Sequence, residues 1–149
     1  PIQVSRPQRS WKCRATNMTL VDANVLIDLF TDDPEWSDCS RAALLDAAGR
    51  GQLGINPIIY AEVSIAFTDP AKLDAALTPL ELVRCELPYA AGFCAGKAFL
   101  KHRRRQGTKH SPFPDFYIGA HAEIAVLDLL TRDTTRYASH FPIVQLICP

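Results

Sequence analysis

The sequence lacks the cysteine spacing of a zinc site and the even cysteine count of a disulfide framework. Five cysteines are scattered over 149 residues, and no two of them form a Cys-x-x-Cys pair. Scattered thiols without a pairing pattern are typical of a reducing compartment. We therefore expect a cytoplasmic protein in which Cys39, Cys85 and Cys94 serve as small buried hydrophobes.

Long apolar runs and glycine-rich phosphate loops are also missing. No apolar run approaches the roughly 20 residues that a membrane-spanning helix needs, and nothing resembles a signal peptide. We therefore expect no membrane partner. The pattern of a P-loop is absent as well. With 48% hydrophobic residues and the length of one ordinary domain, the chain can bury a real core.

Net charge is zero, but the two signs are unevenly distributed along the chain. Between Asp22 and Asp46 there are seven acids and one base, whereas between Leu87 and Pro114 there are six bases and no acid. Such asymmetry is compatible with an acidic site and a separate basic surface for a polyanion. The alternative is that each charge run is a solvated face.

The first 17 residues differ from the rest of the chain. They carry four bases and two prolines, and they show little periodicity. We interpret residues 1–17 as a flexible extension outside a single domain that spans residues 18–149. Met18 is the only methionine, so a natural start at this residue is compatible with the pattern. A basic arm that contacts nucleic acid is the alternative for residues 1–17.

Strand-like and helix-like patterns alternate along the rest of the chain. Alternation of this kind favours an α/β fold, in which a central, mostly parallel sheet lies between two layers of helices as a three-layer α/β/α sandwich. Residues 137–141 are expected to be short and irregular. Strands are expected near 20–21, 51–56, 82–83, 125–131 and 143–147, and helices over about 23–30, 37–48, from 57 onward, 71–77, 89–105 and 116–124.

The stretch from Thr19 to Phe30 contains the first candidate site residue. A short apolar run meets Asp22 and then passes into a helical pattern, so a buried strand delivers a carboxylate to its C-terminal end. In open α/β sheets the carboxyl ends of the strands form the ligand crevice. Asp22 is therefore a site candidate. The alternative is that Asp22 only caps the following helix.

Three later acids lie in similar apolar settings. Asp133 also follows an apolar strand, Glu62 interrupts an apolar helix, and Asp115 opens a helix. Acids brought together raise one another's pKa, so a cluster of them is either protonated or holds a cation. Oxygen-only ligands favour Mg²⁺ or Mn²⁺. The separate alternatives are an ion pair for Glu62, a plain helix cap for Asp115 and a turn at Asp133.

Four segments of this chain resemble the four motifs of PIN-domain ribonucleases. These segments are Val21–Asp28, Tyr60–Val63, Pro114–Ala122 and Leu130–Tyr137. The resemblance covers Met18 to Pro149, and the size and motif order are most similar to the VapC toxins of bacterial toxin–antitoxin pairs. It implies a parallel sheet flanked by helices, a Mg²⁺ or Mn²⁺ site, and endonucleolytic cleavage of RNA.

The resemblance also implies roles for particular residues. The third motif usually reads Asp-Ala/Cys-Leu-Ile-Ala, whereas this chain has the bulkier Asp-Phe-Tyr-Ile-Gly from Asp115 to Gly119, a departure that concerns substrate fit rather than the metal ligand. For His121 we favour packing in the core or at the surface over a role as general base. The four acids of the family map onto Asp22, Glu62, Asp115 and Asp133, with Asn24 and Thr131 as accessory polar residues.

A basic segment precedes the third motif. Phosphate backbones attract such clusters because binding releases counterions, and the place beside a metal site suits RNA. A solvated face is the alternative. The bases that we predict to contact RNA are Lys101, Arg103, Arg104, Arg105 and Lys109.

The sequence therefore predicts a metal-dependent endoribonuclease, the toxin of a type II toxin–antitoxin pair. Its expected partners are the RNA substrate, a cognate VapB-like antitoxin and a second copy in a homodimer. We expect Phe30, Trp36 and Leu45 to contribute to an apolar groove for an antitoxin segment. One rival is a catalytically silent PIN-like protein that binds RNA or serves as a scaffold. Another is a phosphatase of the haloacid-dehalogenase type, which expects an Asp where Asn24 stands.

Overall fold

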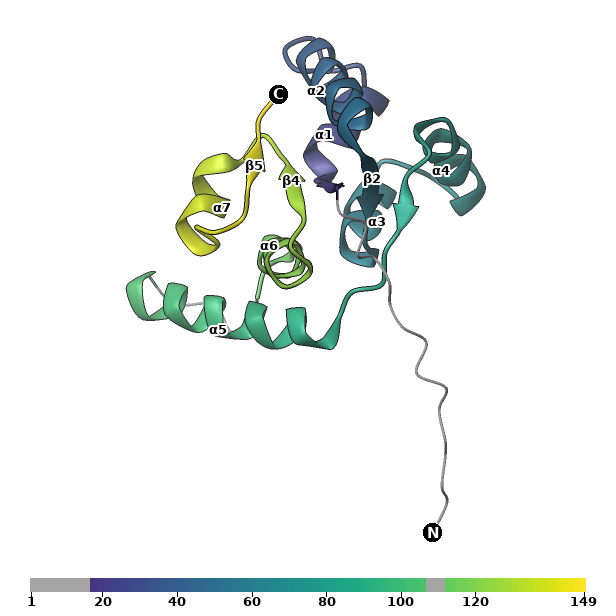
Figure 1. The fold of residues 1–149 in the computed structure, drawn as a ribbon. Helices are drawn as coiled ribbons and strands as arrows, with labels where there is room; N and C mark the ends of the chain where they lie inside the picture. The colour runs from purple at the N-terminus through teal and green to yellow at the C-terminus, as the bar shows by residue number, and fades with distance from the viewer. Residues whose placement is uncertain (1–16, 107–111) are drawn as a thin grey trace, which may run out of the picture.

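The computed structural model describes residues 17–106 and 112–149 (Figure 1). Apart from residue 17, the expected N-terminal extension lies outside these residues. No helix in this part of the chain is both long and apolar enough to cross a membrane. The elements are β1 (Met18–Val21), α1 (Ala23–Phe30), α2 (Ser37–Arg50), β2 (Gln52–Ile55), α3 (Pro57–Ser64), α4 (Pro70–Leu77), η1 (Thr78–Leu80), β3 (Val83–Arg84), α5 (Tyr89–Gln106), α6 (Pro114–Ala125), β4 (Asp128–Leu130), α7 (Thr134–His140) and β5 (Leu146–Ile147).

The five strands form one sheet in the order β3-β2-β1-β4-β5, and every pair is parallel. Helices flank this sheet (Figure 1), so the expected three-layer α/β/α architecture is confirmed. The chain moves outward from β1 to β3 and then returns to place β4 on the other side of β1. The strand order therefore reverses between β1 and β4. Such a switch point, at the carboxyl ends of the strands, is where α/β sheets bind ligands.

Polar side chains cap the N-termini of three helices that follow strands. Asn56 accepts hydrogen bonds from the backbone N–H groups of Ile58 and Ile59 at 3.0 and 2.9 Å. Pro57 occupies the first position of α3, where its missing N–H group has no partner to lose. Asp22 and Asp133 accept backbone hydrogen bonds at the starts of α1 and α7 in the same way. One residue separates β1 from α1 and β2 from α3, and three separate β4 from α7, so these capping side chains stay at the C-terminal ends of the strands.

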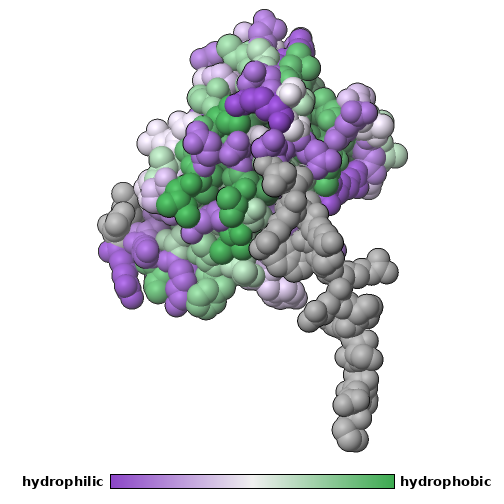
Figure 2. Space-filling view, viewed as in Figure 1, coloured by the Kyte–Doolittle hydropathy of each residue, from purple (hydrophilic) through white to green (hydrophobic). Residues whose placement is uncertain are grey.

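The core lies between the sheet and the helices. Leu20, Val21, Leu129 and Leu130, from the two central strands, are fully buried. Figure 2 shows hydrophobic residues that reach the surface over the middle of the face in view. The large apolar side chains that stay exposed among the described residues include Leu45, Ile65, Tyr89, Phe93, Val126 and Ile143.

Two local expectations were wrong. Residues 134–140 form the helix α7, because Asp133 caps it and the rings of Tyr137 and Phe141 anchor its inner face in the core. Cys39 is exposed on α2, whereas Cys85 is buried and Cys94 half-buried as small hydrophobes. A single thiol on the outer face of a helix gives no periodic signal that would have revealed its exposure.

Gly119 on α6 makes room for an aromatic ring. A Cβ atom at this position would overlap atoms Cδ2 and Cε2 of Phe141. The ring of Phe141 is buried and in turn lies 6.4 Å from the ring of Phe116, measured between centroids. The small residue at 119 thus compensates for the bulk of Phe116 in the unusual third motif.

We expect Gly119→Ala to destabilise the fold by about 1–3 kcal/mol, because the added methyl group overpacks the core against Phe141. Gly96→Ala on α5 is the matched control. No atom lies within 4 Å of its added Cβ, so the better helix propensity of Ala should stabilise the fold by about 1 kcal/mol. Urea unfolding measures both changes. Equal effects of the two substitutions would contradict this account of residue 119.

Candidate metal centre

Asp22 lies at the switch point, where β1 passes into α1. Its side chain is only 4% exposed. Oδ1 accepts a hydrogen bond from the backbone N–H of Ala23 at 2.8 Å, while Oδ2 accepts one from the hydroxyl of Thr131 at 2.7 Å and one from Nδ2 of Asn24 at 3.1 Å. Asp22 is therefore a helix cap and a member of the site at the same time, so the two interpretations of this residue do not exclude each other.

The two accessory polar residues connect the ends of β1 and β4. The hydroxyl oxygen of Thr131 accepts hydrogen bonds from Nδ2 of Asn24 at 3.2 Å and from the backbone N–H of Asp133 at 3.0 Å. Oδ1 of Asn24 accepts from the backbone N–H of Arg132 at 3.3 Å. This network holds the carboxylate of Asp22 in one orientation and fixes the backbone of Asp133 at the end of β4.

Glu62 from α3 and Asp115 from α6 face Asp22. Burial raises the pKa of Glu62 to about 7, and the negative charges of Asp22 and Asp115 contribute to this shift. Burial also raises the pKa of Asp22, although the hydrogen bonds from Thr131 and Ala23 oppose that rise and the charge of Asp115 adds to it. Glu62 therefore senses the charges of Asp22 and Asp115, and Asp22 senses that of Asp115. Three of the four predicted acids thus lie within electrostatic reach of one another.

The side chain of Tyr137, on α7, lies near Asp22, Glu62 and Asp115. Its side chain is 1% exposed. Its buried hydroxyl has no hydrogen-bond partner of normal geometry in the described part of the chain. Burial raises the pKa of this hydroxyl, and the charges of Asp22, Asp115 and Glu62 raise it further. The sequence analysis missed Tyr137 because it expected an irregular segment there.

Asp133 is joined to the other acids through Arg136. The guanidinium of Arg136 pairs with Asp115 through Nη1 and with Asp133 through Nε, the latter at 3.1 Å from Oδ2. Asp133 does not contribute to the pKa shifts of Asp22 or Glu62. We therefore place Asp133 at the rim of the cluster. Arg136 was missed by the sequence analysis, although its position three residues after a helix-capping Asp could have indicated an ion pair.

The donor atoms fit a hard divalent cation. Among the residues that the structure describes, no three acids, histidines or cysteines are arranged to hold a metal ion. Asp22, Glu62, Asp115 and Tyr137 offer carboxylate and hydroxyl oxygens only, which suits Mg²⁺ or Mn²⁺ rather than zinc. Arg136 offsets the charge of Asp115 and Asp133, but Asp22 and Glu62 form no ion pair in the described part of the chain. A bound cation would neutralise these two acids, of which Asp22 is buried and Glu62 half-buried.

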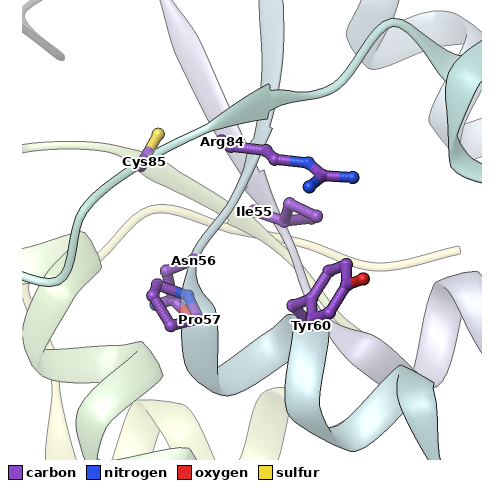
Figure 3. Close-up of a pocket in the computed structure, with 6 residues that line it drawn as sticks. All are labelled: Ile55, Asn56, Pro57, Tyr60, Arg84 and Cys85. Carbon is purple, nitrogen blue, oxygen red and sulfur yellow. The ribbon is translucent and has the colours of Figure 1, made fainter. Parts of the chain in front are cut away.

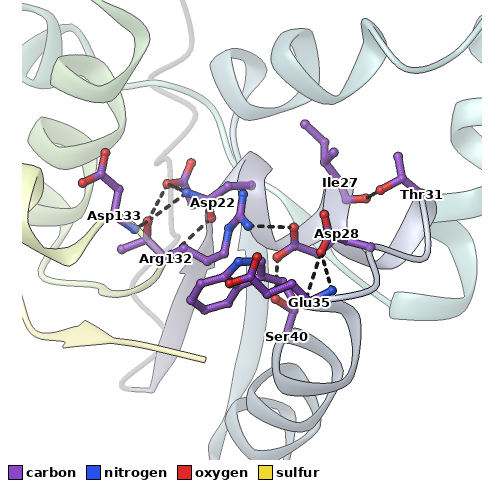
Figure 4. A network of polar contacts seen from close by, with 12 residues as sticks. Asp22, Ile27, Asp28, Thr31, Glu35, Ser40, Arg132 and Asp133 are labelled. Carbon is purple, nitrogen blue, oxygen red and sulfur yellow. Dashed lines mark hydrogen bonds and ion pairs between the residues drawn. The ribbon is translucent and has the colours of Figure 1, made fainter.

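A second arginine anchors the loop after β4 (Figure 4). Arg132 pairs through Nη1 with Oδ1 of Asp28 at 3.3 Å, and its guanidinium lies over the ring of Trp36 at 5.0 Å. Asp28 is only 2% exposed and also accepts a hydrogen bond from the hydroxyl of Ser40 at 2.6 Å. Because Arg132 stands between Thr131 and Asp133, this buried contact ties the loop that carries them to α1 and α2.

His121 lies in the core, as we favoured from the sequence. It is 1% exposed, and its Nδ1 accepts a hydrogen bond from Nδ2 of Asn56 at 3.0 Å. Burial lowers the pKa of His121 to about 4, so the imidazole is neutral near pH 7. It therefore contributes packing between α3 and α6 rather than a charge.

The basic segment lies on α5. Lys101, Arg103 and Arg104 are exposed there. The side chain of Arg105 and the whole of Lys109 lie outside the described residues. The structure therefore places three of the five predicted RNA contacts on the surface of one helix.

A small pocket lies at the C-terminal ends of β2 and β3 (Figure 3). It has a volume of about 210 Å³. Its polar groups are engaged within the protein, since Arg84 pairs with Asp74 at 2.5 Å and the hydroxyl of Tyr60 donates to the same carboxylate at 3.2 Å. This pocket is therefore a weaker candidate site than the acids. Its lining residues are Ile55, Asn56, Pro57, Tyr60, Arg84 and Cys85.

Comparison with known families identifies the class of the protein. The model of the PIN domain family matches residues 19–138, so the chain belongs to this family. No curated protein sequence matches the chain.

Solved structures share the fold over nearly the whole chain. A toxin–antitoxin complex from Klebsiella pneumoniae is 25% identical with a TM-score of 0.60, covering 87% of this chain and 95% of its own. VapBC2 from Rickettsia felis, bound to a promoter DNA fragment, is 14% identical with a TM-score of 0.68 and covers 89% and 98%. DNA-bound VapBC from Salmonella typhimurium is 20% identical with a TM-score of 0.63 and covers 88% and 97%.

The raised pKa of Glu62 predicts how stability depends on pH without metal. The pKa of Glu62 in the folded chain is about 7, whereas the ordinary pKa of this side chain, which applies to the unfolded chain, is 4.5. Ionisation of Glu62 therefore destabilises the fold progressively between these two pH values, and the penalty is complete above about pH 7. We expect Glu62→Gln to match the parent near pH 4 and to be more stable than the parent at pH 8.

Urea unfolding at the two pH values, in the presence of a chelator, measures this difference. Glu86→Gln is the control, because its side chain is exposed and should give the same stability as the parent at both pH values. A Glu62→Gln variant that is no more stable than the parent at pH 8 would contradict the proposed crowding of the acids.

Proposed function

We propose that this protein is a metal-dependent endoribonuclease and the toxin of a type II toxin–antitoxin pair. The observation that carries the proposal is the meeting of Asp22, Glu62 and Asp115 around the hydroxyl of Tyr137, at the switch point of a PIN-family sheet. Acids that raise one another's pKa are typical of functional sites, because a bound cation relieves their mutual repulsion.

In this proposal different residues bind the metal ion, orient its ligands and donate hydrogen bonds. Asp22, Glu62 and Asp115 would hold Mg²⁺ or Mn²⁺, with Asp133 at the rim. When bound, the ion activates water and stabilises charge on the phosphodiester. Thr131 and Asn24 keep the carboxylate of Asp22 oriented through their hydrogen bonds. The raised pKa of Tyr137 keeps its hydroxyl protonated, so it can act as a hydrogen-bond donor within the site.

RNA is the substrate that the surface favours. Lys101, Arg103 and Arg104 give α5 an exposed positive face, and α5 packs on α6, which carries Asp115. A polyanion that follows this face would be guided to the acids. The predicted contacts of Arg105 and Lys109 belong to the same proposal. We place this activity in the cytoplasm because the cysteines of the sequence are odd in number and show no pairing pattern.

A VapB-like antitoxin and a second copy of the chain are the partners in this proposal. The similar structures from Klebsiella pneumoniae and Rickettsia felis are described as a toxin–antitoxin complex and as VapBC2, which supports an antitoxin for this chain. Leu45 is 66% exposed on α2, while Phe30 and Trp36 are half-buried nearby in the chain. These side chains are the proposed contacts of an antitoxin segment.

A catalytically silent PIN-like protein that binds RNA or serves as a scaffold is the second candidate. One observation favours it, namely that Arg136 already supplies a positive charge to Asp115 and Asp133. In a silent protein this arginine would replace the metal permanently. In an enzyme the ion pair has to open, which its exposed position allows.

Asp115→Asn tests the proposal most cleanly, because Asp115 caps no helix. We expect it to lower Mg²⁺- or Mn²⁺-dependent cleavage of single-stranded RNA by more than about a hundredfold, since even indirect supports of a metal site contribute 10–100-fold. Its stability without metal should equal or exceed that of the parent, because Asp115→Asn removes negative charge beside Asp22 and Glu62 and its lost partner, Arg136, is more than half exposed. Asp22→Asn should also abolish cleavage, but it disturbs a buried hydrogen-bond network and so lowers stability.

Asp46→Asn, on the exposed face of α2, is the control and should cleave like the parent. Full activity of Asp115→Asn would reject the nuclease assignment. A parent protein that binds RNA but cleaves none with either ion would favour the silent candidate.

A further inference from the structure

A pocket of about 310 Å³ lies beside the acids. Its wall comes from α5, from the residue that precedes α6, and from α6 and α7. Three elements that are distant in the sequence therefore enclose one space. The lining residues are His102, Phe113, Phe116, Arg136 and His140.

Flat rings make up most of this wall. The ring of Phe116 is stacked with that of Phe113 at 6.2 Å between centroids and lies 4.8 Å from the ring of His140. His102 and His140 meet edge to face at 5.1 Å. Phe116 is buried and held from behind by Phe99 at 5.8 Å, whereas the other three rings are half-buried. Phe116 is thus the buried base of the wall, and the rings of His102, Phe113 and His140 stay partly exposed.

The pocket adjoins the acids through Arg136. Phe116 directly follows Asp115 in α6, and Arg136 both lines the pocket and pairs with Asp115 and Asp133. On the other side, the half-buried ring of His102 lines the pocket, and its neighbours in α5, Lys101 and Arg103, are exposed bases. A ligand in the pocket would therefore lie between a row of cations and the proposed site of cleavage.

We propose that this pocket binds one unpaired RNA base next to the phosphodiester that is cut. This inference rests on the proposed function. Nucleobases stack on phenyl, imidazole and guanidinium groups, and all of these line the pocket. The cations beside it match a phosphate backbone rather than an apolar peptide. A base within a duplex cannot enter such a space, so the subsite selects single-stranded RNA.

The third-motif departure now has a physical account. A small side chain after Asp115, as is usual in the family motif, could not form the base of this ring wall. Phe116 supplies the ring, and Gly119 leaves the space in which Phe141 packs against it. The bulky motif thus supplies the ring wall of the pocket next to Asp115.

Phe113→Leu removes one half-buried ring while it keeps apolar volume. We expect it to weaken binding of a labelled, mixed-sequence single-stranded RNA of 12 nucleotides about tenfold, the size of one lost stacking contact. Binding of an abasic ribose-phosphate strand of the same length should not change. Phe113→Trp should bind RNA like the parent. Fluorescence anisotropy with the full chain in metal-free buffer measures all of these affinities.

Matched variants separate stacking from charge and from folding. Phe93→Leu removes an exposed ring from the same helix as His102 and should leave RNA affinity unchanged. Arg103→Gln with Arg104→Gln should weaken RNA and the abasic strand equally. His102→Ala gives a second, independent removal of a ring and should repeat the selective loss for RNA. Thermal unfolding of each variant shows which of them are folded at the temperature of the assay.

Several outcomes overturn the subsite. It is wrong if folded Phe113→Leu and His102→Ala bind RNA like the parent, if they weaken RNA and the abasic strand equally, or if the parent binds no RNA. Cleavage with Mg²⁺ or Mn²⁺ is assayed separately. A parent that cleaves while Phe113→Leu binds normally rejects the subsite but keeps the nuclease. Selective loss of RNA binding without any cleavage by the parent keeps the subsite and rejects the nuclease.

Discussion

The buried carboxylate of Asp22 sets the condition that the rest of the site satisfies. A charge in this position is costly unless several donors compensate for it. The backbone of α1, the amide of Asn24 and the hydroxyl of Thr131 each donate to it, and Thr131 brings the end of β4 against the end of β1. The hydrogen bond from Thr131 thus both stabilises Asp22 and joins the ends of β1 and β4. Glu62 and Asp115 add negative charge that these donors cannot offset.

Two arginines close to the acids act in opposite ways. Arg132 is held by buried Asp28 and by the ring of Trp36, so the loop after β4 is anchored to the helices that follow β1. Arg136 is more than half exposed and pairs with Asp115 and Asp133 at the rim. A cation can therefore replace Arg136 beside Asp115 and Asp133, and a phosphate can bind the released Arg136, while Arg132 keeps the loop after β4 in place. Arg132 therefore anchors the loop of the site, whereas Arg136 is an exposed countercharge that a ligand can displace.

The local chemistry of the sequence predicted the sheet and the meeting of three acids. Asp22 follows strand β1, and Glu62 and Asp115 lie on helices next to β2 and β4 in the chain. The alternation of strands and helices was therefore enough to predict that these side chains lie near one another. Contacts that depend on long-range packing were not predictable. The ion pairs of Arg136, the buried hydroxyl of Tyr137 and the ring pocket each join segments that only the folded chain brings together. Helix α7 escaped prediction because Thr and Ser are poor helix formers and its stability comes from a cap and a buried Tyr.

Titration of the protein with Mn²⁺ tests the central claim, that these acids form a cation site. The melting temperature of the parent should rise as the Mn²⁺ concentration is raised at pH 8, because the ion binds the folded chain and relieves the repulsion among Asp22, Glu62 and Asp115. The rise should be smaller at pH 5, where Glu62, with a pKa of about 7, holds a proton that competes with the ion. A melting temperature that does not respond to Mn²⁺ at either pH would contradict the account.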